Sequence, residues 1–227
     1  GIFVLPFILV RIFRPTFLEV YELSNEEMGY CFSTYGIVAL ISYLLGGSLA
    51  DRFKPRYLIA ISLWMTAAAG FWMATIPSYN EMIIIYGFFG FSTIFLFWSA
   101  LIKTTRIWGG ELSQGKAFGI LDGGRGLVGS AFGFLGLAVF ATIVTRPDLD
   151  VPIEQKKEIF GNVVVYSSSF VALIGIFVFL GLKLKDDGIK AAKSTLDNYK
   201  QCLKLPAVWT LMIIILSAYV GYKSTDY

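Results

Sequence analysis

The apolar residues of this chain occur in long blocks, and short polar segments separate one block from the next. A helix needs about 20 apolar residues to cross about 30 Å of hydrocarbon, and seven blocks approach that length. None of them alternates apolar and polar residues with a period of two, which indicates helices and not strands. The pattern predicts an all-α, polytopic membrane protein, with helices at about 1–20, 27–50, 57–76, 81–104, 114–145, 163–182 and from 207 onward.

Two polar segments indicate how these helices are organised. Ser24, followed three residues later by Glu27, is a capping-box pattern and predicts the start of the second helix. A segment rich in Lys and Asp separates the sixth block from the seventh. Because the sequence starts with Gly inside one apolar block and ends inside another, we interpret it as a fragment of a longer chain. Its predicted parts are a six-helix N-terminal bundle (1–182), a linker (183–206) and the start of a further helix (207–227).

Composition supports a bilayer location and excludes several functions. Hydrophobic residues make up 56% of the chain and charged residues 15%, and the mean hydropathy is +0.68. The excess of 19 basic over 16 acidic residues is too small to indicate a nucleic-acid partner. With no histidine and two cysteines far apart in sequence, we expect no metal site and no cofactor. The chain also lacks a phosphate-binding P-loop and a Ser/His/Asp set, so we expect no enzyme activity.

Basic residues between the helices predict the orientation. The second-to-third, fourth-to-fifth and sixth-to-seventh connections contain twelve Lys and Arg, and the other three connections contain three. By the positive-inside rule, the three connections that contain the twelve basic residues are cytoplasmic. We expect a multi-pass protein of the plasma (inner) membrane, with its linker inside.

Four basic residues remain at membrane depth: Arg11, Arg14, Arg125 and Lys223. From the helical rise, Arg11 lies roughly 14 Å from the outer end of its helix and Arg125 roughly 16 Å from the inner end of its own, so both are near the bilayer centre. A base there costs at least about 2.5 kcal/mol and normally faces a partner or a water-filled cavity. Arg14 is closer to the outer surface, where its side chain can reach the headgroups.

Asp122 lies three residues before Arg125, so the two share a helix face. They can form a structural ion pair, with Arg11 satisfied by backbone carbonyls or by Glu19. Alternatively, one acid is too few for several bases at one depth, and the surplus positive charge binds an anion. The glycines that recur along this helix, from Gly119 to Gly136, we interpret as a packing stripe. The aromatic run of the fourth helix, which includes Trp98, we interpret as packing or lipid-facing surface.

The connection between the second and third helices reads GGSLADRFKPR, from Gly46 to Arg56. It resembles the loop signature of the major facilitator superfamily, a small residue followed by Leu-Ala-Asp-Arg and a basic cluster. This resemblance implies two six-helix halves with the substrate bound between them at the midplane. It also implies a cytoplasmic latch that opens with the inward gate, made by Gly47, Asp51, Arg52 and Arg56.

A narrower resemblance is to the organophosphate/phosphate antiporter branch. Its features here are the ending Asp-Arg-x-x-Pro-Arg, the run Ile-Leu-Val before Arg11, and the spacing of Trp98, Thr104, Trp108 and Gly115. Asp122 stands on an Asn position of the branch, and Arg125 on a His position associated with substrate. Lys223 falls at or next to the seventh-helix Arg that holds phosphate. This chain departs from the branch at two places. It has Tyr43 where the glycerol phosphate transporter has a Lys, and Ser99-Ala100 where the branch usually has Pro-Pro.

These observations predict a secondary transporter of a small organic anion, a phosphorylated sugar or polyol ahead of a sugar acid. Arg11 and Lys223, one from each half, would grip the anion, and Arg125, oriented by Asp122, would be a further cation. Two alternatives remain: a transporter-like receptor for the same anion, and a proton-coupled symporter of a sugar acid or other carboxylate with Asp122 as proton carrier. We expect the anionic substrate and the lipid bilayer as partners, and a monomeric transport unit.

Overall fold

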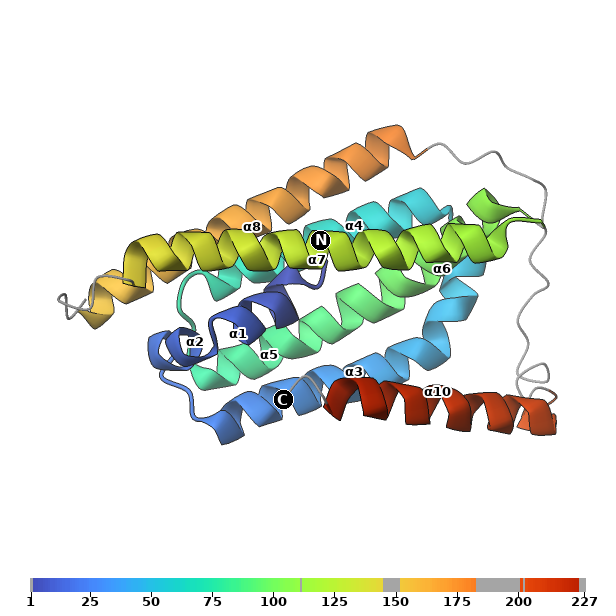
Figure 1. The fold of residues 1–227 in the computed structure, drawn as a ribbon, viewed down its shortest axis with the longest axis horizontal. Helices are drawn as coiled ribbons and strands as arrows, with labels where there is room; N and C mark the ends of the chain where they lie inside the picture. The colour runs from blue at the N-terminus through green and yellow to red at the C-terminus, as the bar shows by residue number, and fades with distance from the viewer. Residues whose placement is uncertain (1, 111, 145–151, 183–200, 202, 225–227) are drawn as a thin grey trace. The chain divides into compact units, whose positions relative to one another are not determined.

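The computed structural model describes residues 2–110, 112–144, 152–182, 201 and 203–224. These residues form helices joined by short connections, as Figure 1 shows. The chain divides into two compact units, Gly1–Asp187 and Gly188–Tyr227, and each is described by itself. Most of the predicted linker, 183–206, lies outside the described residues.

The first predicted span is not one regular helix. It consists of a π-helix η1 (Val4–Ile8), a short α1 (Leu9–Ile12) and α2 (Arg14–Val20), with a break at Phe13. Proline explains both irregularities, because its nitrogen cannot donate a helical hydrogen bond. Pro6 lies within η1, and Pro15 cannot donate to the carbonyl of Arg11. The hydroxyl of Tyr86 donates to the Pro6 carbonyl at 3.2 Å.

The second and third spans are regular helices, α3 (Asn25–Arg52) and α4 (Pro55–Met73). The predicted capping box is confirmed. The Glu27 backbone N–H donates to Ser24 Oγ at 3.1 Å, and the Ser24 N–H donates to the Glu27 carboxylate at 2.8 Å. α4 begins with a proline, whose missing N–H costs nothing in a first turn.

The fourth span runs from Tyr79 to Gly109 as α5 (Tyr79–Gly90), a π-helix η2 (Phe91–Trp98) and α6 (Ser99–Gly109). Two buried hydroxyls of η2 donate back to the Phe89 carbonyl, from Ser92 at 3.4 Å and from Thr93 at 2.7 Å. Such bonds compete with the regular helical ladder and accompany its change of pitch. The same hydroxyls pair with neighbouring helices, Ser92 with Thr66 at 2.9 Å and Thr93 with Tyr35 at 2.8 Å.

The remaining helices are α7 (Gln114–Val144), α8 (Ile153–Gly181) and, in the second unit, α10 (Pro206–Ser224). Among the described residues, Tyr79–Gly109 and Ile153–Gly181 are long and apolar enough to cross a bilayer by composition alone. α8 begins about ten residues before the predicted Val163. Its first turns therefore contain two lysines that the sequence assigned to a loop, Lys156 and Lys157.

These two lysines join α8 to the end of the first span. Lys156 Nζ donates to Glu19 at 2.6 Å, and Lys157 Nζ donates to Glu22 at 2.7 Å. The hydrogen bond from Lys157, and then its positive charge, lower the pKa of the Glu22 carboxyl. Glu19, which the sequence suggested as a partner of Arg11, accepts the hydrogen bond from Lys156.

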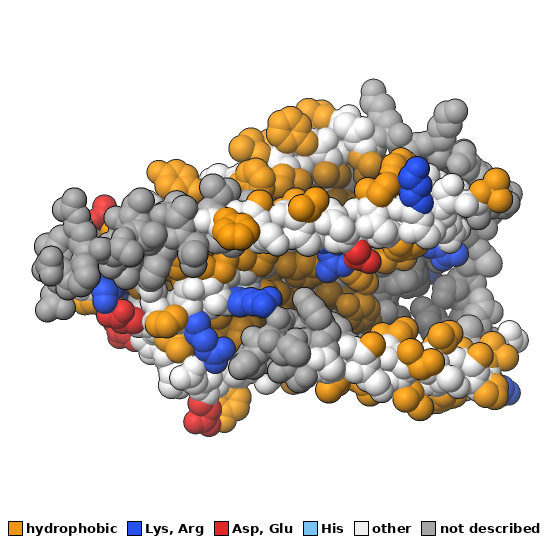
Figure 2. All heavy atoms as spheres, viewed as in Figure 1, with side chains coloured by type: hydrophobic (Ala, Val, Ile, Leu, Met, Phe, Trp, Pro, Cys, Tyr) orange, Lys and Arg blue, Asp and Glu red, His pale blue; other side chains and the backbone are white. Residues whose placement is uncertain are grey.

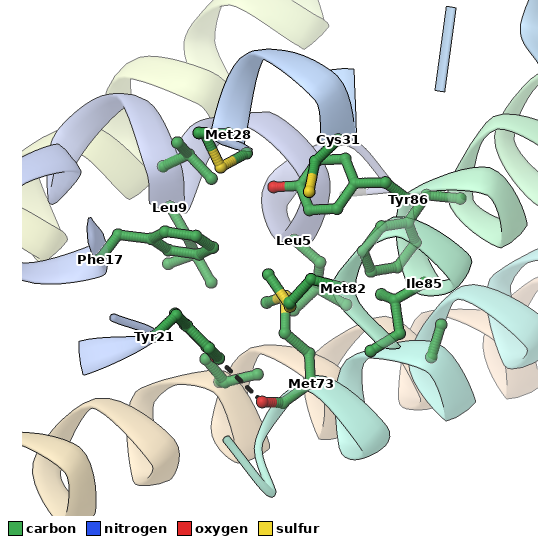
Figure 3. Packing of buried hydrophobic residues seen from close by; sticks show 14 of the residues in the cluster. Leu5, Leu9, Phe17, Tyr21, Met28, Cys31, Met73, Met82, Ile85 and Tyr86 are labelled. Atoms are coloured by element: carbon green, nitrogen blue, oxygen red, sulfur yellow. Dashed lines mark hydrogen bonds between the residues drawn. The ribbon is translucent and has the colours of Figure 1, made fainter. Parts of the chain in front are cut away.

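The main core lies between the first span, α3, α4, α5 and α8. Leu5, Phe17, Met28 and Met73 are fully buried in it. Figure 3 shows these side chains interlocking, with the hydroxyl of Tyr21 donating to the Met73 carbonyl at 3.0 Å. That bond satisfies a polar group inside apolar surroundings, where an unpaired one would cost free energy.

Close contact between α4 and α8 depends on glycine. A side chain at Gly70 would collide with Ser168 Oγ and with Leu5, which are closer than 3.0 Å to its Cβ position. On α8, a Cβ at Gly175 would lie 2.6 Å from the indole nitrogen of Trp64. Side chains at either position would force the two helices apart.

We predict that Gly70→Val destabilises the full-length protein, by about 1–3 kcal/mol in view of the overpacking it causes. Thermal unfolding of the detergent-solubilised protein measures the effect. Gly29→Ala in α3 is the matched control, because nothing lies within 4 Å of its Cβ position. An equal fall in unfolding temperature for both variants would contradict the α4–α8 contact.

Candidate functional site

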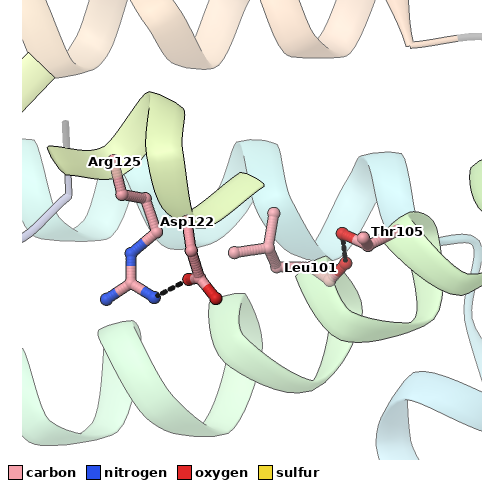
Figure 4. Close-up of polar contacts among 4 residues, drawn as sticks. All are labelled: Leu101, Thr105, Asp122 and Arg125. Atoms are coloured by element: carbon pink, nitrogen blue, oxygen red, sulfur yellow. Dashed lines mark hydrogen bonds and ion pairs between the residues drawn. The ribbon is translucent and has the colours of Figure 1, made fainter. Parts of the chain in front are cut away.

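The predicted acid and base of the fifth span form an ion pair on α7. Arg125 Nη1 lies 3.0 Å from Asp122 Oδ1, one turn earlier on the same helix. Figure 4 shows both side chains extending to the same side of α7, near α6. The side chain of Arg125 is 47% exposed and that of Asp122 68%, so both remain accessible to a ligand.

Arg125 also lies against an aromatic ring of the fourth span. Its guanidinium carbon is 5.0 Å from the centroid of the Trp98 ring, within the range of a cation–π interaction. Trp98 is the last residue of η2 and is half-buried. The sequence analysis interpreted the aromatic run around Trp98 as packing or lipid-facing surface and did not predict this contact, since a contact between side chains of different helices has no signature in local spacing.

The other predicted cation of this unit, Arg11, lies in α1 and is exposed. Both α1 and η1 contact α7, so the elements that carry Arg11 and Arg125 are neighbours in this unit. Arg14 has a structural role: its Nε and Nη2 donate to Asn25 Oδ1 at 3.3 and 3.0 Å. It thereby ties α2 to the start of α3.

Lys223 belongs to the second unit, near the end of α10. Its side chain is outside the described part of the structure. Its part in a common site with Arg11 and Arg125 therefore stays a prediction.

The glycines of α7 lack the contacts that we expected. At Gly119, Gly123, Gly126 and Gly129, nothing lies within 4 Å of the Cβ position. The close packing predicted for these four is therefore not found in the described part of this unit, and the surroundings of Gly133 and Gly136 fall outside it. Figure 2 shows the surface of α7 as largely white, the colour of backbone and of uncharged polar side chains. Within the unit, this leaves open space beside the Asp122 and Arg125 pair.

The predicted cytoplasmic motif lies where α3 ends and α4 begins. Gly47 and Arg52 are exposed on α3, and Asp51 is in its last turn with a side chain outside the described part. Arg56 Nη2 donates to the hydroxyl of Tyr57 at 2.9 Å, and the guanidinium lies 5.6 Å from the Phe179 ring of α8. Arg56 therefore links α4 to α8, and its role in a latch stays a prediction.

Lys103 makes a contact at the end of α3 that the sequence did not predict. It is one of the basic residues counted with the fourth-to-fifth connection, and its Nζ donates to the Ala50 carbonyl at 2.7 Å. Ala50 is in the last turn of α3, where carbonyls lack helical partners and the helix dipole favours a cation. Lys103 therefore holds the segment that contains Asp51 against α6.

The next question is whether the described residues contain a metal-binding group of side chains. No group of three or more His, Cys, Asp or Glu side chains is close enough there to hold an ion. The half-exposed guanidinium of Arg125 is able to form charge-assisted hydrogen bonds.

Comparison with known proteins assigns the chain to a family. The family model described as Major Facilitator Superfamily matches residues 2–226, nearly the whole chain. The chain belongs to the major facilitator superfamily. Membership in this transporter family confirms the predicted all-α membrane fold and points to a transporter and not to an enzyme.

Individual relatives are more distant. The chain is 28% identical over 213 residues to Inner membrane protein YqcE of Escherichia coli, an alignment that covers 90% of this chain and 47% of the relative. It is 26% identical to Inner membrane protein YihN of the same organism, with 90% and 48% covered. Identity to the Probable nitrate/nitrite antiporter NarK1 of Thermus thermophilus is 26%, with 90% and 45% covered. The chain thus spans about half the length of these curated relatives, and no solved structure matches it.

We predict that Lys103→Met lowers the unfolding temperature of the full-length protein, because the Ala50 carbonyl loses a hydrogen bond from a charged donor, worth about 1.5–3 kcal/mol. Lys103→Arg should restore most of the loss, since a guanidinium can also donate to that carbonyl. Thermal unfolding in detergent measures both variants. Equal stability of Lys103→Met and the parent protein would contradict this role.

Proposed function

We propose that the full-length protein is a secondary transporter of a small organic anion. The observation that carries the proposal is the state of Arg125: a half-exposed guanidinium held by one carboxylate and one aromatic ring, at a position that the sequence predicts to lie near the bilayer centre. A base at this depth is costly in lipid and normally marks a substrate or ion pathway. Family membership agrees with transport.

The local charge balance supports an anionic substrate. In α7, residues 114–144 contain two bases, Lys116 and Arg125, but one acid, Asp122. A substrate carrying negative charge would accept hydrogen bonds from the guanidinium donors of Arg125 that Asp122 leaves unused.

The substrate we favour is a phosphorylated sugar or polyol. This choice rests on the resemblance to the organophosphate/phosphate antiporter branch and on the fit between a guanidinium fork and a phosphate. A relative whose name includes nitrate/nitrite antiporter supports an anion in general. Because two relatives are named as inner membrane proteins, we propose the same location for this chain, with the basic connections cytoplasmic.

The mechanism is alternating access around an anion held at the midplane. Arg11 and Lys223 bind the anion from the two halves, and Arg125 binds it while Asp122 fixes the guanidinium. When the anion leaves, Asp122 is the remaining partner of Arg125, so occupied and empty states pair different charges and differ in free energy. Gly47, Asp51, Arg52 and Arg56 act as the cytoplasmic latch, and one monomer is the transport unit.

Counterflow of labelled sugar phosphate into proteoliposomes tests this function. We predict that the full-length protein exchanges sugar phosphate and that Arg125→Gln raises the KM about tenfold or more, because a charge-assisted hydrogen bond is lost. Arg14→Gln is the matched control and should leave the KM unchanged, since Arg14 is bound to Asn25 away from the pair. Binding without counterflow would instead support a receptor.

Asp122→Asn separates exchange from proton coupling. If Asp122 only orients Arg125, the neutral amide keeps a hydrogen-bond acceptor, and anion exchange should persist with a changed KM. Uptake driven by an imposed pH gradient is the measurement. Loss of gradient-driven accumulation with counterflow intact would favour the proton-coupled alternative, with Asp122 as the carrier.

A further inference from the structure

We propose that Trp98 is a positioning residue for Arg125. Its ring orients the guanidinium and so determines which N–H groups face the anion. This inference rests on the proposed function and adds to it a residue from a different helix. Its basis is the 5.0 Å separation between the Arg125 guanidinium carbon and the Trp98 ring centroid, together with the ion pair from Arg125 to Asp122.

The two partners of Arg125 leave a defined set of donors. A guanidinium has five N–H groups, all in its plane. Asp122 accepts from Nη1 on one edge. With Trp98 limiting rotation of the group and Asp122 holding that edge, the remaining in-plane donors have a fixed direction, which suits the bidentate binding of a phosphate or carboxylate.

The ring can act as a platform because it is itself held. Trp98 packs against the main core and meets the Phe3 ring edge-on, with centroids 6.4 Å apart. Trp98 is the last residue of η2. Two buried hydroxyl pairs join this helix to its neighbours, Thr93 with Tyr35 of α3 and Ser92 with Thr66 of α4. The Phe3 contact and the core therefore hold the ring, and the two hydroxyl pairs hold the helix that carries it.

An aromatic partner also has an electrostatic advantage over a second carboxylate. The face of an indole attracts a cation through its quadrupole and has no net charge. It can offset part of the cost of holding Arg125 at membrane depth without competing with the substrate as an anion would. A second carboxylate in its place would neutralise the site and weaken anion binding.

A double-mutant cycle in the full-length protein tests the inference, with inorganic phosphate and a sugar phosphate as probes and dissociation constants measured in detergent. We expect Trp98→Leu to weaken binding about tenfold when Arg125 is present, and less than twofold in the Arg125→Gln background. Trp98→Phe should recover part of the loss, because a phenyl face also attracts a cation. Trp108→Leu, at a 63% exposed tryptophan, is the control and should leave binding unchanged.

The outcomes separate the inference from the function on which it rests. Equal losses in the two backgrounds would overturn it, because Trp98 would then act through packing alone. The same conclusion follows if Trp98→Phe binds no better than Trp98→Leu while both unfold at the temperature of the parent protein. If the parent protein binds neither probe, the proposed function fails, and the positioning role fails with it.

Discussion

The sequence predicts Arg125 at hydrocarbon depth, where holding a guanidinium costs free energy, and the proposed site is built around that cost. Arg125 is held by one short ion pair to Asp122 and one aromatic face from Trp98, and it remains half-exposed. An ion pair at this exposure contributes little to stability, so stabilisation by itself is a weak reason for the pair. The arrangement is instead that of a cation kept accessible, which supports a role with an external anion.

Irregular backbone surrounds this cation on the side of the first and fourth spans. Two prolines divide the first span, so that Arg11 lies in the last turn of the short α1. The fourth span has π geometry from Phe91 to Trp98, and the hydroxyls of Ser92 and Thr93 there donate to the Phe89 carbonyl. π-Segments within helices occur frequently at functional sites. Here η2 contains Trp98 and η1 directly precedes the α1 helix of Arg11, while the regular α4 and α8 pack tightly through Gly70 and Gly175.

Local sequence predicted the parts of this structure that depend on local chemistry. The lengths of the apolar blocks gave the helices, the spacing of Ser24 and Glu27 gave a helix start, and the three-residue spacing of Asp122 and Arg125 gave their pair. Contacts between distant segments could not be found in this way, such as Lys103 with Ala50 or Arg125 with Trp98. The packing of glycines could not be predicted from spacing either. Several glycines of α7 have nothing near their Cβ positions, whereas Gly70 lies directly against a neighbouring helix.

The central claim is that positive charge near the midplane recognises an anion. Equilibrium binding of a phosphorylated sugar and of the same sugar without phosphate to the purified full-length protein tests it most directly. The account predicts saturable binding of the phosphorylated form, weakened by Arg125→Gln, and no measurable binding of the neutral sugar at the same concentration. Equal affinity for the two sugars would contradict it.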